Sequence, residues 1–211
     1  MTELTDNLLQ LFCIFICGCH SCVLTIRSRS YKRLLVLLFY LSFGMGLTYW
    51  VLYLILFGTS PLVFCVSELS WTASYIFLAL RLYADMPKEK QKEKAVFWIL
   101  PAFSFAMGIF FCIRGSYFEN ILMGTAMGVL GYYAVKGICL AKIRNRSGKP
   151  LIFYAALFFY AAEYLLWISS YFITENTIVS PYYLVDIFIL NPALILIAAA
   201  QSKEETLCRT T

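Results

Sequence analysis

Three acidic residues, Glu68, Glu163 and Asp186, stand inside long apolar stretches of this chain. A carboxyl group within a lipid bilayer is costly and rare, so each is a candidate site residue. Counted along helices, the three lie at depths that agree within one to two turns, in the same half of the membrane. Cationic partners are few, since only Arg114 could reach one of them and Lys136 lies near the opposite end of its stretch. We therefore expect these carboxyls to be protonated or to pair with a bound cation.

Aromatic residues share helical faces with two of these carboxyls. Trp71 and Tyr75 follow Glu68 by three and seven residues, and Tyr160 and Trp167 flank Glu163. These spacings place side chains on one face of a helix. Aromatic ring faces attract ammonium groups by about 0.5–2 kcal/mol. We predict an outward-facing pocket for a cationic or proton-coupled substrate, lined by Glu68, Trp71, Tyr75, Tyr160, Glu163, Trp167 and Asp186.

A proline lies in the middle of the last apolar stretch, in the pair Asn191-Pro192. Proline lacks a backbone N–H and disfavours helix at the residue before it. We predict a kink here, with the Asn191 side chain bonding the freed carbonyls. Functionally, the pair is interpreted as a hinge.

These side chains sit on elements whose nature follows from composition. Of the 211 residues, 61% are hydrophobic and only 14% are charged, which is more apolar surface than a soluble domain can bury. Uncharged runs of about 20 residues suit a bilayer core. We predict an all-α integral membrane protein, a seven-transmembrane-helix bundle with spans at 8–26, 34–57, 62–83, 95–113, 120–141, 151–173 and 182–200.

Lysine and arginine are distributed unevenly between the connectors. Four follow the first span, five follow the third and four follow the fifth, whereas the other side carries only Arg114. Basic connectors face the cytoplasm. The N-terminus is therefore predicted outside and the C-terminus in the cytoplasm, with the protein multi-pass in the cell membrane. The net charge of +5 is explained by orientation, so no nucleic-acid partner is expected.

Two segments of the chain resemble each other. CVLTIRSRSYKRL (22–34) and CLAKIRNRSGKPL (139–151) share seven of thirteen positions. The same offset brings Trp50 onto Trp167, and Ser60-Pro61 falls on Ser180-Pro181 after a short insertion. We predict one polytopic domain, 1–211, built as a 3+1+3 parallel internal repeat: 8–83, a linker helix 95–113, and 120–200.

This order of spans resembles, in topology only, that of SWEET-type sugar transporters and, more loosely, of seven-helix rhodopsins. The Pro-Gln pair of the first family is absent from the expected places, and the last span, VDIFILNPALIL, has no lysine for retinal. The two-half design favours a small-solute carrier. A receptor or sensor that signals to a separate cytoplasmic partner is the alternative, and an intramembrane enzyme acting on lipid is a second one.

Other chemistry has weaker support in the sequence. Neither a Gly-x-Ser-x-Gly nor a His-Glu-x-x-His motif occurs, so no catalytic residue is assigned. Cys13, Cys17 and His20 share a helical face and are of types that bind soft metals. A single helix cannot close a tetrahedron of ligands, so we predict neither a metal site nor a cofactor.

Overall fold

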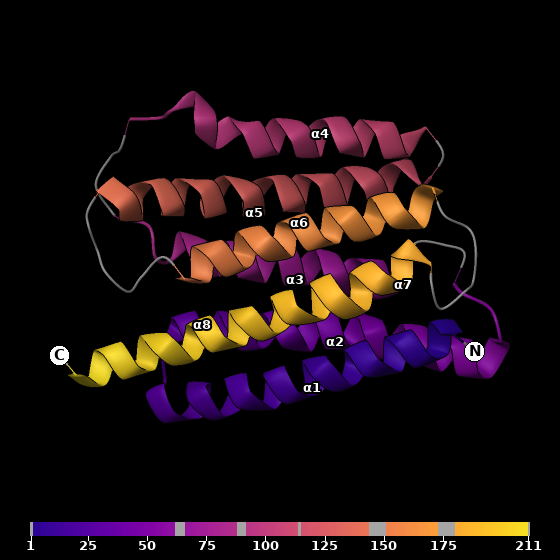
Figure 1. The fold of residues 1–211 in the computed structure, drawn as a ribbon, viewed down its shortest axis with the longest axis horizontal. Helices are drawn as coiled ribbons and strands as arrows, with labels where there is room; N and C mark the ends of the chain where they lie inside the picture. The colour runs from indigo at the N-terminus through magenta and orange to yellow at the C-terminus, as the bar shows by residue number, and fades with distance from the viewer. Residues whose placement is uncertain are drawn as a thin grey trace.

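The structure, a computed structural model, describes residues 2–61, 66–87, 92–113, 115–143, 151–172 and 180–210. Seven long helical rods lie side by side along the longest axis of the molecule (Figure 1). No strand occurs in these ranges. The elements are α1 (Thr2–Ser28), α2 (Tyr31–Phe57), α3 (Val66–Tyr83), the 3-10 turn η1 (Ala95–Trp98), α4 (Ile99–Cys112), α5 (Tyr117–Ile143), α6 (Leu151–Phe172), α7 (Pro181–Val185), the π-helical η2 (Asp186–Leu190) and α8 (Asn191–Thr210).

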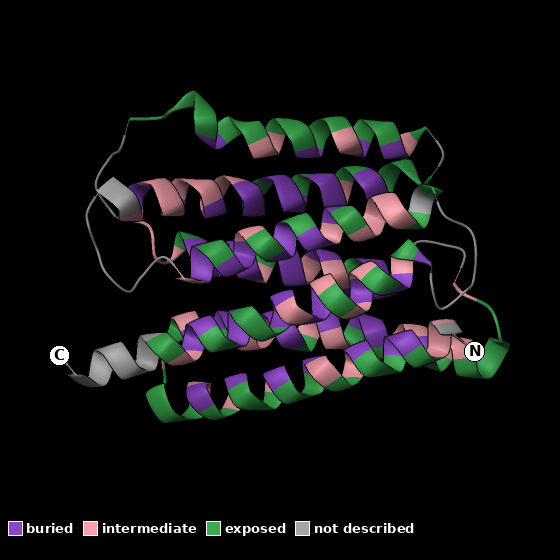
Figure 2. Ribbon diagram, viewed as in Figure 1, coloured by how far each residue is buried: buried purple, intermediate pink, exposed green. Residues whose placement is uncertain are grey.

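Six of these rods are long and apolar enough to cross a membrane: all but α3. Large hydrophobic side chains such as Phe12, Phe15 and Phe105 are exposed on the outer faces, as a lipid-facing surface requires (Figure 2). Helix α3 buries several polar residues, including Ser67 and Glu68. The apolar residues 62–65, included in the predicted span 62–83, lie outside the described part of the chain. The prediction of a helical membrane bundle is confirmed at this level.

The rods form a ring with one helix outside it. Each helix contacts the next in the order α1, α2, α3, α5, α6 and α8, and α8 contacts α1. Helix α4 packs on α5 at the edge of the bundle (Figure 1). A Cβ added to Gly124 would lie 3.1 Å from the backbone oxygen of Ser104 and 3.4 Å from the Cα of Gly108. The small residues of α5 therefore serve packing within the chain.

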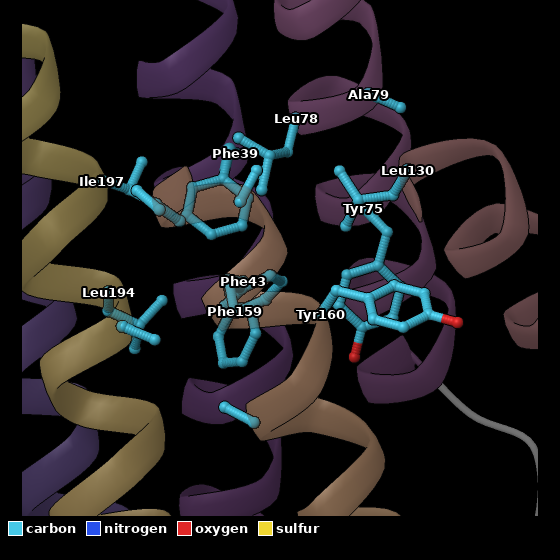
Figure 3. Packing of buried hydrophobic residues seen from close by; sticks show 14 of the residues in the cluster. Phe39, Phe43, Tyr75, Leu78, Ala79, Leu130, Phe159, Tyr160, Leu194 and Ile197 are labelled. Carbon is cyan, nitrogen blue, oxygen red and sulfur yellow. The ribbon is translucent and has the colours of Figure 1, made fainter. Parts of the chain in front are cut away.

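An aromatic layer fills the centre of the ring. Phe39 and Phe159 are fully buried with ring centroids 5.3 Å apart, and Phe43 lies 6.1 Å from Phe159. Figure 3 shows these rings between Leu194 and Ile197 of α8 on one side and α3 on the other. Interiors packed in this way have few voids as large as a water molecule. The layer therefore separates the two ends of the bundle.

The last rod contains the predicted irregularity. Between α7 and α8 the hydrogen bonds widen to the π pattern, and the Asn191 N–H bonds the Asp186 carbonyl. Pro192 supplies no N–H, and its ring would clash with the carbonyl four residues earlier in a regular α-helix. A π turn provides extra room. The expected bonding by the Asn191 side chain is wrong, because neither amide atom has a hydrogen-bond partner among the described residues. Whether the segment moves as a hinge stays a prediction.

An ion-paired cluster closes the end of the ring remote from the N-terminus. Asp85 follows α3 and pairs with Arg81, one turn earlier, and with Lys32 at the start of α2. Arg81 is only 1% exposed. Burial alone would raise the pKa of Asp85, but the charges and hydrogen bonds of Arg81 and Lys32 hold it below its usual value. The cluster therefore fastens α2 to α3.

Candidate functional site

A cavity of about 530 Å³ lies between the helices at the end of the ring that carries the N-terminus. Five carboxylic acids line it, each from a different rod: Glu3, Glu68, Glu119, Glu163 and Asp186. Its aromatic walls are Phe43, Trp50, Trp71, Tyr75, Trp167, Tyr182 and Tyr183. The cavity is thus both acidic and aromatic, and it ends against the aromatic layer.

Six of the seven predicted binding residues line this one cavity. Glu68 and Trp71 reach it from the first turns of α3, and Tyr75 follows one turn deeper. Glu163 and Trp167 reach it from α6, and Asp186 lies where the π segment begins. The structure therefore brings three distant segments together at one site, while their role in binding stays a prediction.

Tyr160, the seventh residue, does not line the cavity. Its hydroxyl donates to the Leu100 carbonyl at 3.2 Å and lies 2.8 Å from the Ser104 hydroxyl. Both partners belong to α4, so the Tyr160 ring lies on the side of α6 that faces α4. Tyr160 therefore lies against α4 and not on the lining of the cavity, and its role in binding stays a prediction.

Hydrogen bonds orient the carboxyl groups. The Tyr75 hydroxyl donates to Glu163 Oε2 at 3.0 Å, whereas Glu163 Oε1 has no partner among the described residues. The Ser67 hydroxyl donates to Glu68 Oε2 at 2.9 Å. Each of these two bonds comes from a neutral hydroxyl, so neither adds a positive charge to the cavity.

Two cavity carboxyls are absent from the predicted set. Glu3 accepts hydrogen bonds from Trp50 Nε1 at 3.2 Å and from the Ser60 hydroxyl at 2.7 Å. Glu119 lies in the first turn of α5, across from Glu68. The predicted spans began at 8 and 120, yet α1 begins at Thr2 and α5 at Tyr117. Both carboxyls therefore belong to helices rather than to the loops before them.

Positive charge is scarce around the cavity. No Lys, Arg or His occurs among the described residues that line it. Arg114, the expected partner for one carboxyl, lies outside the described residues. Lys136 pairs with Glu93 at 2.6 Å, at the end of α5 remote from Glu119, as its predicted position requires. The described lining of the cavity is therefore acidic and aromatic, without a basic side chain.

The histidine and two of the cysteines considered as metal ligands lie on α1, outside the cavity. His20 Nε2 lies 2.6 Å from the Ser202 hydroxyl, between α1 and α8. Cys13 and Cys17 are free thiols of α1. Over the ranges that the structure describes, no three His, Cys, Asp or Glu side chains are grouped so that they could hold a metal ion.

Comparison with known proteins gave no match: no family model, no curated protein sequence and no solved structure resembles this chain. The geometry of the cavity is therefore the basis for a function.

Proposed function

We propose that the protein is a small-solute carrier whose cavity binds an organic cation. The observation that supports it is a cavity lined by five carboxyls and seven aromatic rings, with no basic side chain among its described residues. Glu163 Oε1 is a buried acceptor with no partner among the described residues, and a ligand with an ammonium group would supply one. Ring faces would add about 0.5–2 kcal/mol for each well-placed cation contact.

The predicted duplication supports a carrier built from two halves. Trp50 and Trp167, which the repeat equates, both line the cavity, as do Ser60 and Ser180. The ring order is compatible with a twofold relation, because the contact of α3 with α5 is matched by that of α8 with α1. We propose seven spans in a 3+1+3 order, with the N-terminus and the cavity on the outer side of the cell membrane.

Binding is testable with a charged ligand and a neutral analogue of the same shape. Choline has a positively charged quaternary nitrogen where 3,3-dimethylbutanol has a neutral quaternary carbon. Three of the four tryptophans line the cavity, so tryptophan fluorescence of the protein in lipid nanodiscs should report binding. We expect choline, and not the alcohol, to give a saturable change. Equal responses to the two compounds would contradict a cation site.

A matched pair of variants localises the effect. Glu163→Gln removes one cavity charge and should weaken choline binding about tenfold, which corresponds to about 1.4 kcal/mol. Glu93→Gln removes a carboxylate at the other end of the bundle and should leave binding unchanged. Similar affinities for the two variants would mean that choline does not bind in the cavity.

One observation favours the receptor alternative. The buried rings of Phe39, Phe43 and Phe159 lie between the cavity and the inner end of the ring, as in a receptor that never opens inward. Uptake of radioactive choline into proteoliposomes distinguishes the two. Uptake supports a carrier, whereas binding without uptake supports a receptor with a cytoplasmic signalling partner.

A further inference from the structure

A second polar cluster lies beside the cavity, in the seam between α1 and the last rod. Asp6 and Gln10 of α1 face Asp186 at the start of η2, and the three are 4%, 4% and 2% exposed. Gln10 Nε2 donates to Asp186 Oδ1 at 2.5 Å. The Asp6 and Asp186 carboxyls lie close enough to interact electrostatically. The seam thus holds two carboxyls from opposite ends of the chain.

These carboxyls have too few donors around them. Neither oxygen of Asp6 has a donor among the described residues, and the amide of Asn191, which is 5% exposed, has no partner for its oxygen or its nitrogen. Ionisable or polar groups nearby are Glu3, Cys13, Glu163 and Tyr182.

No lysine, arginine or histidine is among these neighbours. Two facing carboxyls repel unless a positive charge is held between them. One bound cation would remove this repulsion, since it neutralises one of the two carboxylates.

The π segment borders this seam. Asp186 begins it and Asn191 follows it, and Cys13 Sγ lies 3.9 Å from the Asn191 carbonyl. Pro192 cannot donate to the preceding turn, so carbonyls outnumber donors there. Interrupted helices in membrane carriers commonly coordinate sodium or protons through such groups.

We propose that Asp6 and Asp186 together bind one monovalent cation, a proton or a sodium ion, beside the organic cation. This second site rests on the proposed function, because its purpose is to couple binding of the small cation to binding of the organic cation. Asp186 also lines the cavity, so a cation held in the seam changes the charge that the organic ligand meets. The two affinities must then depend on each other reciprocally.

The test measures cation binding directly, on the full chain in lipid nanodiscs. Binding of radioactive sodium is measured at neutral pH, and infrared difference spectra record the C=O stretch of any protonated carboxyl. The variants are Asp6→Asn and Asp186→Asn, which keep shape while removing charge. Glu93→Gln, which removes a carboxylate paired with Lys136 at the other end of the bundle, is the control.

Sodium binding that both aspartate variants lose and Glu93→Gln keeps identifies a sodium site. Absence of sodium binding, with a protonated-carboxyl band lost in the same two variants and kept in the control, identifies a proton site. Absence of both signals, or their equal loss in the control, overturns the proposal. Choline binding measured on the same wild-type sample separates this failure from failure of the cation cavity. A folded Asp6→Asn protein suffices for the test if Asp186→Asn does not fold.

Discussion

Gly46 lies where α2 and α3 approach most closely behind the cavity. A Cβ on this residue would lie 2.9 Å from the backbone oxygen of Ser67, 3.0 Å from Trp71 Nε1 and 3.1 Å from the Cβ of Ser70. A backbone oxygen cannot rotate away, so Gly46→Ala must push the two helices apart by several tenths of an ångström. Overpacking of this kind costs about 1–3 kcal/mol. It also displaces Trp71 on the cavity wall.

The matched control is Gly18→Ala on α1, where the added Cβ would meet Tyr40 Cβ at an ordinary 3.7 Å. Replacement of glycine by alanine within a helix stabilises by up to about 1 kcal/mol where space allows. We therefore expect Gly46→Ala to lower the free energy of unfolding and Gly18→Ala to leave it equal or higher. Equilibrium unfolding by SDS in mixed micelles, followed by tryptophan fluorescence, measures both. Equal stability of the two variants would show that α2 and α3 are not in close contact at Gly46.

Three further predictions concern separate parts of the molecule. Asp85→Asn should destabilise the protein by about 1–3 kcal/mol at neutral pH. Because the folded-state pKa of Asp85 lies below the usual 3.8, this stabilisation exists above that value and disappears as the pH falls through the folded pKa, so the melting temperatures of wild type and variant should converge in acid. The hydrogen bond from Lys136 also lowers the pKa of Glu93, but the Glu93 side chain is 52% exposed, so Glu93→Gln should show a smaller trend. A cysteine at Ser116, in a variant without the native cysteines, should react with an impermeant thiol reagent in intact cells; reaction only after lysis would reverse the proposed orientation. Tyr75→Phe should weaken choline binding because it removes the donor to Glu163. Tyr160→Phe should lower the free energy of unfolding by about 1 kcal/mol and leave choline binding unchanged. A choline titration in which Tyr160→Phe binds more weakly than Tyr75→Phe would contradict this assignment of roles.

The helices were predictable because they depend on local composition. Every predicted span overlaps a helix. The predicted start of the first helix, residue 8, was too late because the charged residues before it were assigned to a loop. Glu3 and Asp6 lie in the first turns of α1. The polar residues Glu3, Asn7 and Gln10 recur at helical spacing and could have indicated this. Asp186 was predicted as a site residue, but the π-helical backbone that begins there was not. That geometry depends on backbone hydrogen bonds, which the spacing of residues in the sequence does not specify.

The site was predictable in part for a different reason. Carboxyls inside apolar stretches must face the interior, so Glu68, Glu163 and Asp186 could be assigned to one region without knowledge of the fold. Helical spacing could not separate Tyr160 from the other six residues, because only tertiary packing places Leu100 and Ser104 of α4 against it. The seam at Asp6 depends on α1 meeting α8, a contact between the two ends of the chain that helical periodicity does not specify.

The position of α4 outside the ring has a consequence for divergence among related sequences. None of its described residues lines the cavity, and its packing face is fixed by the close approach of Gly108 to Gly124 and by the contacts of Leu100 and Ser104 with Tyr160. Substitutions on its lipid face are therefore constrained by apolarity alone, whereas the ring helices must preserve specific carboxyls and rings. Over evolutionary time α4 should accumulate changes faster than the six rods around the cavity, and a family alignment anchored on α4 would miss relatives that an alignment anchored on α3, α6 and η2 would find.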